Sequence, residues 1–206
     1  MLHIGVDEAG RGPLFGRVYS AAVILPEEGS SNIDLSLIKD SKKFTKSNKI
    51  KEVAKYIKEN ALYWNVEYVD EDVIDKKNIR EATFICMHKA IKNVLNEIDD
   101  PFKCHLNIDG NAFKPLIFCK NEKFIEIPYT CIVQGDAIDK SISAASILAK
   151  TARDEYIENL CDENPELEEK YDLRNNKGYG TKKHREGIAK HGRTKWHRQT
   201  FKLKNI

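Results

Sequence analysis

The amino-acid sequence predicts an α/β protein with a central, partly antiparallel sheet and helices packed against it. Short apolar runs typical of buried strands, such as Leu2–Val6 and Val18–Leu25, alternate with segments whose apolar residues recur at helical spacing. The longest helical segment, Ile138–Leu160, is rich in small residues, which let a helix pack close to a sheet. Strands and helices therefore mix along the chain, as in α/β domains.

In the first half of the chain, each predicted element has its own signal. The polar stretch Pro26–Ser36 follows the second strand and is expected to form a loop. Leu62–Val69 is predicted to be a strand, because Trp64 and Tyr68 fall at alternating positions. Between the two lies a predicted helix, from Lys46 to Asn60, with apolar residues at helical spacing: Ile50, Val53, Ala54 and Ile57.

The second half continues the mixed pattern. A short helix is expected over Glu71–Asp75 and a long one over Ile79–Ile98, where apolar residues recur at helical spacing. Cys104–Ile108 and Phe124–Ile127 are predicted to be strands. The apolar residues Cys131–Val133 then lead into Gln134-Gly135-Asp136, just before the longest helix.

Length and composition limit the class of protein. The 206 residues suit one domain with a substantial core, which we divide into residues 1–160 and a basic helical or loop segment, 161–206, packed on it. No apolar run approaches the roughly 20 residues of a membrane span, and the N-terminus does not resemble a secretory signal. Five cysteines without a C-x-x-C pair favour reduced thiols, so we expect an intracellular, cytoplasmic protein with no membrane partner.

The net charge of +2 hides a strong charge asymmetry. From Lys177 onward, ten Lys and Arg residues stand against a single acid, Glu186, whereas Glu158–Asp172 contains seven acids and one lysine. A further group of six lysines lies between Lys39 and Lys51. Separated basic patches on a nearly neutral chain suit a polyanionic partner, although any one patch could equally be a solubilising surface.

The stretch from Ile4 to Pro13 carries the clearest chemical signal. An apolar run ends in the adjacent acids Asp7 and Glu8, followed by the turn Gly10-Arg11-Gly12. Neighbouring side chains in a regular strand point to opposite faces, so we expect the strand to end at these acids. Carboxylates bind hard cations such as Mg²⁺, and a nearby arginine with open glycine backbone suggests a phosphate ligand. An isolated acidic pair on the surface is the alternative.

Two further acids at similar junctions argue against that alternative. Asp109 follows a predicted strand and precedes Gly110, and Asp136 follows Gly135 before the longest helix. Carboxylates converging in a sheet-rich domain can hold two divalent ions about 4 Å apart, which clamp both sides of a phosphoryl displacement. Without cations the clustered acids would repel one another and raise each other's pKa. We therefore expect Asp7, Glu8, Asp109 and Asp136 to converge.

These motifs, with others along almost the whole chain, resemble those of the type 2 ribonuclease H (ribonuclease HII) family. The resemblance implies a ribonuclease H-like fold and hydrolysis of the RNA strand of RNA/DNA hybrids. It also implies incision 5′ of a ribonucleotide embedded in duplex DNA, leaving 5′-phosphate and 3′-hydroxyl ends, with Mg²⁺ or Mn²⁺. The matching stretches are Asp7–Leu14, Lys39–Lys43, Asn78-Ile79, Asp109–Asn111, Gly135-Asp136, Ser143–Lys150, Lys177–Thr181 with His184, and His191-Gly192 with His197-Arg198.

The resemblance also assigns roles to individual residues. The four carboxylates fall on the family's metal-site positions, which implies two divalent ions during turnover. Gly10-Arg11-Gly12 falls where the family contacts the 2′-hydroxyl and phosphates around the ribonucleotide, and Tyr179 where a tyrosine stacks on the sugar at the RNA–DNA junction. Lys42 and Lys43 are expected to meet backbone phosphates, which gives affinity without sequence readout.

The chain departs from the family pattern at four positions. Arg17, Gly180, Arg193 and Lys195 stand where proline is common. Gln199-Thr200-Phe201 matches a sliding-clamp-binding tail too poorly to predict one, and we expect a monomer.

Three alternative functions are weighed against this interpretation. A catalytically silent hybrid-binding module is disfavoured because clustered acids do not help to bind polyanions. A nuclease acting on DNA only does not need the glycine loop or Tyr179. The related type 3 enzymes usually carry an added N-terminal domain, whereas this sequence starts directly at the first strand.

Overall fold

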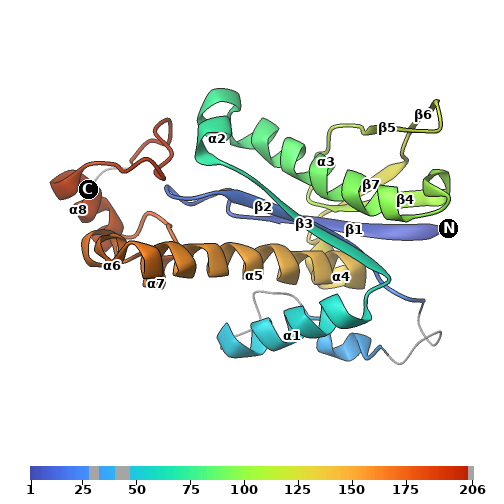
Figure 1. Cartoon of the computed structure of the whole chain (residues 1–206), viewed down its shortest axis with the longest axis horizontal. Coiled ribbons are helices and arrows are strands. Elements are labelled where there is room, and N and C mark those ends of the chain that lie inside the picture. The colour runs from blue at the N-terminus through green and yellow to red at the C-terminus, as the bar shows by residue number, and fades with distance from the viewer. Residues whose placement is uncertain (28–32, 40–46, 204–206) are drawn as a thin grey trace.

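The structure, a computed structural model, describes residues 1–27, 33–39 and 47–203. Lys42 and Lys43, the two predicted phosphate contacts, lie outside these residues. The described chain forms a sheet with helices on both faces and a group of short helices at one end (Figure 1).

Five strands make up the main sheet, in the order β3-β2-β1-β4-β7. The central strand β1 pairs antiparallel with β2 and parallel with β4; β2 pairs antiparallel with β3, and β4 parallel with β7. The predicted mixed sheet is therefore confirmed. The strands are β1 (Leu2–Ala9), β2 (Val18–Ile24), β3 (Tyr63–Val69), β4 (Cys104–Asp109) and β7 (Tyr129–Ile132), and a separate hairpin consists of β5 (Ile117–Lys120) and β6 (Lys123–Glu126).

Helices cover the two faces of the sheet unequally. Helix α3 lies over one face, and α5 and α1 lie over the other (Figure 1). Short helices complete the described chain at its connections and at the C-terminal end. The bounds are α1 (Ser47–Asn60), α2 (Glu71–Lys77), α3 (Ile79–Glu97), α4 (Gly135–Ile138), α5 (Lys140–Glu163), α6 (Pro165–Tyr171), α7 (Leu173–Asn176) and α8 (Lys182–His191), with 3₁₀ turns at Leu35–Leu37 and Pro101–Lys103.

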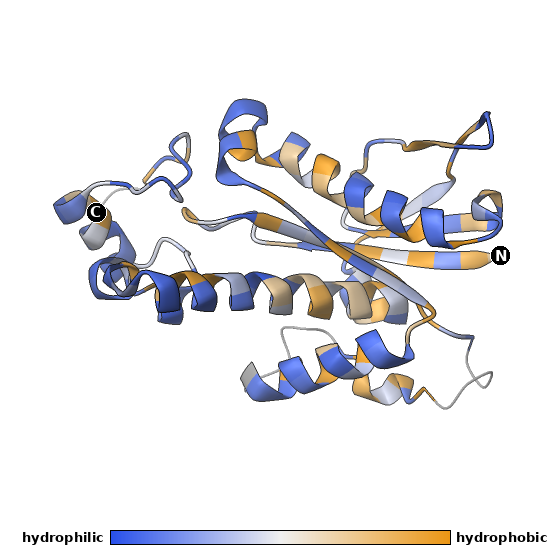
Figure 2. Ribbon diagram, viewed as in Figure 1, coloured by the Kyte–Doolittle hydropathy of each residue, from blue (hydrophilic) through white to orange (hydrophobic). Residues whose placement is uncertain are grey.

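Helix α5 packs closely against β1. A β-carbon at Gly5 would lie 2.1 Å from the backbone carbonyl carbon of Ser141, so only glycine allows this contact. The predicted run of small residues continues the contact, since Ala144, Ala145 and Ala149 are fully buried. Figure 2 shows α5 apolar where it crosses the sheet and hydrophilic toward α6.

The first strand is longer than predicted. The sequence predicts an apolar strand over Leu2–Val6 that ends at the two acids, but β1 continues through both acids to Ala9. The reason is the neighbouring strand: Glu8 pairs with Ser20 and Ala9 with Tyr19, so the β1–β2 ladder continues past the acids.

Other boundaries differ by a few residues. The longest helix begins at Lys140 rather than Ile138, because Asp139 caps it by accepting hydrogen bonds from the backbone N–H groups of Ser141 and Ile142. Strand β5 was not predicted, and β7 begins before the apolar run that marked it. Both strands are only four residues long, which leaves little pattern to recognise.

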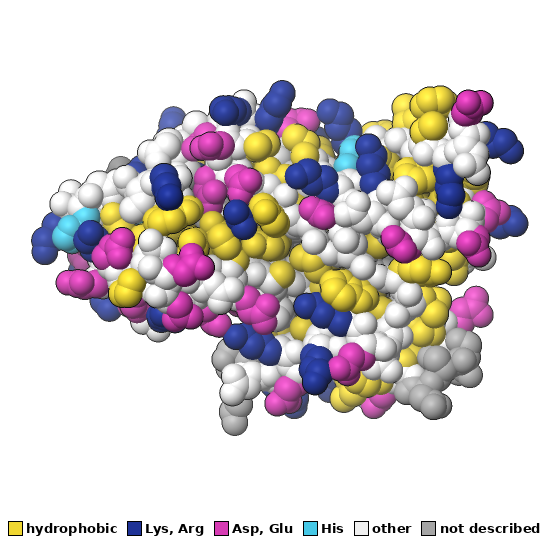
Figure 3. Space-filling view, viewed as in Figure 1, with side chains coloured by type: hydrophobic (Ala, Val, Ile, Leu, Met, Phe, Trp, Pro, Cys, Tyr) yellow, Lys and Arg dark blue, Asp and Glu magenta, His cyan; other side chains and the backbone are white. Residues whose placement is uncertain are grey.

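The C-terminal segment shares a hydrophobic cluster with the end of α5. Leu167, Tyr171 and Ile188 pack there with Phe15 and Leu160. The proposed division after residue 160 stays a prediction; it would fall inside α5. Hydrophobic side chains are also exposed at the β5–β6 hairpin, which projects at the upper right (Figures 1 and 3). Within the described residues, no helix combines the length and apolar character needed to cross a bilayer.

Candidate active site

Most of the predicted site residues meet at an open cavity of about 360 Å³. The cavity lies where the end of β1, the loop that follows it, the end of β4 and the middle of α5 come together, and Tyr179 reaches it from the C-terminal segment. The structure thus brings together residues from four distant parts of the sequence. The lining residues are Asp7, Glu8, Ala9, Gly10, Arg11, Gly12, Asp109, Ser146, Lys150, Arg153, Asp154 and Tyr179.

Asp7 is the most enclosed acid of the cavity, with 5% of its surface exposed. Its carboxylate accepts a hydrogen bond from the backbone N–H of Glu8 at 2.7 Å and one from the Ser146 hydroxyl. Burial raises the pKa of Asp7 well above its ordinary value, and the charges of Glu8 and Asp109 raise it further. Among the described residues, Asp7 therefore lacks a nearby positive charge that would stabilise its ionised form.

Glu8 has a different environment on the neighbouring position of β1. Its Oε1 forms an ion pair with the Arg11 guanidinium at 3.1 Å. Burial raises the pKa of Glu8, while Arg11 opposes the shift and Asp109 adds to it. Glu8, Arg11 and Asp109 also line a second cavity of about 380 Å³, which extends toward Arg80 and Phe84 of α3. The two cavities therefore adjoin at these three residues.

Asp109 is the last residue of β4 and lies next to β1 in the parallel ladder. Its Oδ1 accepts a hydrogen bond from the backbone N–H of Gly135 at 2.7 Å. Asp136, the following residue, is buried and is not among the residues that line the cavity. Three of the four predicted acids therefore border one cavity, and the fourth lies one residue beyond the glycine that contacts Asp109.

The described residues contain no group of three His, Cys, Asp or Glu side chains arranged to hold a metal ion. Each acid at the cavity instead has a protein partner: Ser146 for Asp7, Arg11 for Glu8 and the Gly135 N–H for Asp109. The donor set nevertheless suits a hard divalent cation, because it consists of carboxylate oxygens whose mutual repulsion a cation would relieve. The role of the four acids as metal ligands stays a prediction.

The glycine loop and Tyr179 lie next to one another at the cavity. A β-carbon at Gly12 would lie 3.4 Å from Cε1 of the Tyr179 ring. Gly10 has a φ of +95°, and a β-carbon there would collide with the buried Arg153 side chain. The positive φ and the close approach of Arg153 therefore each require glycine. Tyr179 is 51% exposed. Its ring is thus available to a ligand, and is not a buried packing residue.

Sequence reasoning missed the contribution of α5. Ser146, Lys150, Arg153 and Asp154 line the cavity, and Lys150 Nζ pairs with Asp154 Oδ2 at 2.9 Å. These residues are three or four positions apart, so they share one face of the helix. Extending the helical face from Ser146 toward the C-terminus could have identified them.

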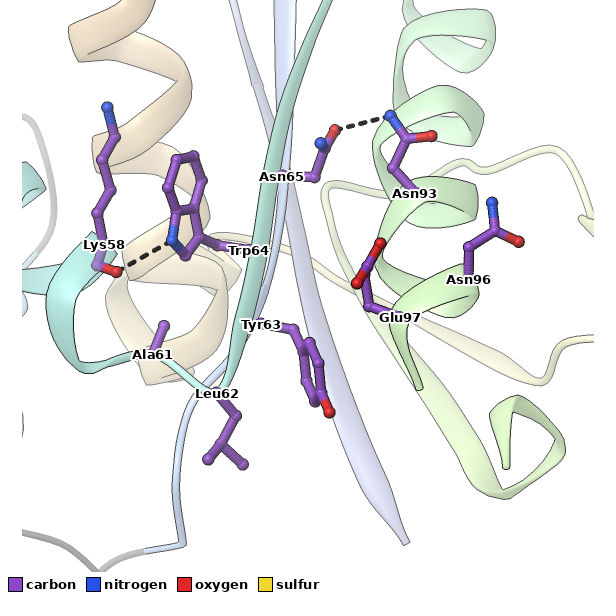
Figure 4. A pocket seen from close by; sticks show the side chains of 9 residues that line it. All are labelled: Lys58, Ala61, Leu62, Tyr63, Trp64, Asn65, Asn93, Asn96 and Glu97. Atoms are coloured by element: carbon purple, nitrogen blue, oxygen red, sulfur yellow. Dashed lines mark hydrogen bonds between the residues drawn. The ribbon is translucent and has the colours of Figure 1, made fainter. Parts of the chain in front are cut away.

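A larger cavity lies elsewhere, at the edge strand β3, with a volume of about 570 Å³ (Figure 4). None of the predicted site residues lines it. Trp64 Nε1 donates to the Lys58 carbonyl at 3.0 Å, and Asn93 Nδ2 donates to Asn65 Oδ1 at 3.2 Å. The cavity lacks the carboxylates, the glycine loop and Tyr179, so its size does not make it the functional site.

A mixed sheet whose central strand carries two acids beside a third on the adjacent parallel strand agrees with the ribonuclease H-like fold that the sequence motifs imply. The model of the family described as Ribonuclease HII matches residues 4–204. The chain therefore belongs to the ribonuclease HII family. It is an endonuclease that hydrolyses the RNA strand of RNA/DNA hybrids and depends on divalent metal ions.

Individual relatives agree with this assignment. The chain is 43% identical over 205 residues to ribonuclease HII of Bacteroides fragilis strain YCH46, covering 98% of this chain and 90% of that protein. It is 43% identical over 203 residues to ribonuclease HII of Chlorobium luteolum, with 98% and 89% coverage.

Solved structures show the same fold at lower sequence identity. The ribonuclease H2 of Pyrococcus horikoshii OT3 superposes with a TM-score of 0.74 at 23% identity, covering 98% of this chain and 94% of that one. RNase HII from the PCNA:RNase HII complex of Archaeoglobus fulgidus gives 0.73 at 22% identity, with 100% and 98% coverage. Bst-RNase HIII in complex with Mn²⁺ gives 0.69 at 20% identity, and the match spans only 67% of that chain. The ribonuclease H-like fold is thus confirmed.

Proposed function

We propose that this ribonuclease HII incises duplex DNA on the 5′ side of a single embedded ribonucleotide, in addition to cutting RNA/DNA hybrids. The observation that carries this proposal is the meeting of Asp7, Glu8 and Asp109 with the Gly10–Gly12 loop and Tyr179 at one cavity. A nuclease that cut at every phosphate would need only the acids. The Gly10–Gly12 loop and the Tyr179 ring add groups that can distinguish a ribose from a deoxyribose.

The metal site that we propose comprises Asp7, Glu8, Asp109 and Asp136. Mg²⁺ or Mn²⁺ would supply the activation of a water molecule and the neutralisation of charge on the phosphate. Support for Mn²⁺ comes from the type 3 neighbour solved in complex with that ion. The raised pKa of Asp7 supports a cation at this place, because a nearby positive charge favours the ionised carboxylate.

The residues of the chain position the substrate around this site. Backbone N–H and C=O groups of Gly10–Gly12 suit a ribose 2′-hydroxyl, which both donates and accepts hydrogen bonds. Arg11 is more than half exposed and can leave Glu8 for a phosphate when cations bind to the acids. The Tyr179 ring stacks on the sugar at the junction, and Lys42 and Lys43 contact backbone phosphates. Hydrolysis leaves a 5′-phosphate and a 3′-hydroxyl.

We infer that the enzyme acts as an intracellular monomer. All five cysteines are free, as expected in a reducing compartment. A sliding clamp is a less favoured partner for the segment Gln199–Phe201, although the Archaeoglobus fulgidus relative was solved as a PCNA complex. Here the Gln199 amide donates to the carbonyls of Thr194 and His197, and Thr200 bonds to Asp75, so the segment is already engaged within the chain.

Three labelled substrates test the proposal: a DNA duplex with one ribonucleotide, a long RNA/DNA hybrid and an all-DNA duplex, each with and without Mg²⁺ or Mn²⁺. We expect cutting of the first two only, with metal, and a single product end directly 5′ of the ribonucleotide. Asp109→Asn should abolish cutting of both while binding persists. Cleavage of the hybrid alone would contradict incision at single ribonucleotides, and cleavage of the all-DNA duplex would contradict ribose recognition.

A further inference from the structure

The glycine loop and the Tyr179 loop are connected through a short segment near residue 197. Leu14 N–H donates to the Gly178 carbonyl at 2.9 Å on one side. On the other side, Gly16 N–H donates to the Trp196 carbonyl, and Arg198 N–H donates to the Leu14 carbonyl, both at 2.9 Å. The chain that follows the glycine loop is therefore held between the Tyr179 loop and residues 196–198.

Arg198 fixes the glycine loop directly. Its side chain is fully buried and donates to five backbone carbonyls, which uses all five N–H groups of the guanidinium. Burial lowers its pKa to about 9, and the charge of Arg153 adds to the effect. A buried charge is retained here by its hydrogen bonds. The accepting carbonyls are those of Gly10 (2.6 Å), Arg11 (3.0 Å), Pro13 (2.9 Å), Gly16 (2.9 Å) and Arg17 (3.1 Å).

His197 fixes the Tyr179 loop through His184. The Thr194 N–H donates to His197 Nδ1 at 2.9 Å, so in the neutral ring the proton is on Nε2. That Nε2–H donates to His184 Nε2 at 3.1 Å. The remaining proton of His184, on Nδ1, then donates to the Tyr179 carbonyl at 2.9 Å. The hydrogen-bond partners thus determine both tautomers, and the chain ends on the backbone of Tyr179.

We propose that His197 and Arg198 are positioning residues that set the separation between the Gly10–Gly12 loop and the Tyr179 ring. Two consecutive residues on one backbone hold the two loops, so neither loop can move without the other. The relative position of the loop and the ring decides how well both contact one ribose bound beside them. The inference rests on the proposed incision at single ribonucleotides and names residues that give it its selectivity.

A role limited to stability is the competing explanation, and the chain offers a matched control. Arg193 holds the same segment by donating to the carbonyls of Arg198, Gln199 and Phe201, and it donates to neither substrate loop. Arg193→Lys should therefore loosen the segment without releasing either loop directly. Arg198→Lys keeps the positive charge but loses the fork of five donors. His197→Phe keeps a flat ring of similar size but cannot donate to His184.

The test measures kcat and KM for the single-ribonucleotide duplex and for the long hybrid, at a temperature where circular dichroism shows each variant folded. We expect Arg198→Lys and His197→Phe to lower kcat for the single ribonucleotide by roughly ten- to a hundredfold. Displacing a bound substrate from its reactive position by up to about 1 Å has an effect of this size. The long hybrid should lose far less, because many phosphates position it. Arg193→Lys should lower the melting temperature and leave the ratio of the two substrates unchanged.

The outcomes separate this inference from the proposed function. If the wild type cuts the single ribonucleotide and both variants keep its substrate ratio, the inference is wrong and the proposed function stands. If Arg193→Lys changes the ratio as much as the other two, the effect is general loosening, and the inference is again wrong. If the wild type does not incise at a single ribonucleotide, both proposals are overturned. If either Arg198→Lys or His197→Phe fails to fold, the other variant alone tests the inference.

Discussion

The Tyr179 ring lies against Gly12, with room for no more than a methyl group between them: a β-carbon on Gly12 would stand 3.4 Å from the ring atom Cε1. The two residues are far apart in the sequence and belong to the two loops that border the carboxylates. Their contact places the loop backbone and the ring side by side, where we expect both to contact one ribose.

Gly12→Ala should reduce cleavage at a single ribonucleotide by about tenfold, which corresponds to ~1.4 kcal/mol in the barrier. The added methyl group fits without collision, so the melting temperature should stay the same, but it occupies space between the loop backbone and the ring. Steady-state kinetics on the single-ribonucleotide duplex and the long hybrid measure the effect. Equal losses on both substrates would mean that Gly12 does not help to select the ribose.

Tyr179→Ala should cost roughly ten- to a hundredfold at a single ribonucleotide, because stacking on a flat ring is worth about 1–3 kcal/mol. Tyr179→Phe should be milder, since only the hydroxyl is lost. The side chain is half exposed, so neither change should affect folding. If Tyr179→Ala cuts the single-ribonucleotide duplex as fast as the wild type, the ring is not a sensor.

Asp7→Asn should abolish turnover and yet stabilise the protein when a chelator removes divalent ions. The carboxylate is buried beside two other acids, and its replacement removes that repulsion. We expect a gain of about 1 kcal/mol in the free energy of unfolding, or ~2–4 °C in melting temperature. Adding Mg²⁺ should raise the melting temperature of the wild type more than that of the variant. Thermal melts with EDTA and with Mg²⁺ provide the measurement, and a lower melting temperature for the variant in EDTA would contradict it.

Lys42→Ala with Lys43→Ala should weaken binding to all duplexes alike and flatten its dependence on salt. Each phosphate contact contributes about 0.9 to the slope of log K against log salt concentration on B-form DNA, so two contacts should remove about 1.8. Fluorescence anisotropy at several salt concentrations, with an inactive variant, measures the slope. A loss confined to one base sequence would contradict phosphate contact.

The His184–His197 pair should make the protein less stable in acid. Burial, together with the charges of His184 and Arg193, lowers the pKa of His197 to about 3, whereas an unfolded histidine has a pKa near 6.5. Between these values the unfolded chain binds a proton that the folded chain does not. The stability is therefore complete above pH 6.5 and is lost as the pH falls, by about 1.4 kcal/mol per pH unit for this group. Urea unfolding from pH 7.5 to 4.5 should show this slope, and His197→Phe should reduce it.

The sequence predicted the fold and most of the site because their signals are local. Apolar runs of strand length followed by acids placed Asp7, Glu8 and Asp109 at one edge of a sheet, and the cavity confirms that they come together. The continuation of β1 to Ala9 could not be predicted, because it depends on pairing with Tyr19 and Ser20 rather than on β1 itself.

The residues that hold the two substrate loops in place could not be predicted from the sequence, for a different reason. Arg198 donates only to backbone carbonyls, and every residue has a carbonyl, so its partners leave no pattern in the sequence. The pairing of His184 with His197 was equally hidden, since their spacing matches no metal motif. Arg193 stands where proline is common. Instead of a rigid proline turn, its side chain provides hydrogen bonds to three backbone carbonyls of the C-terminal segment.

The bond between Arg198 and the Gly10 carbonyl spans 188 residues. During synthesis the glycine loop leaves the ribosome long before the residue that gives it shape, and at 5–20 residues per second the delay is roughly 10–40 s. An incomplete chain therefore carries the acids without an ordered loop. A nascent or prematurely terminated product should be unable to cut nucleic acid selectively, so the enzyme acquires its selectivity only after residue 198 has been synthesised.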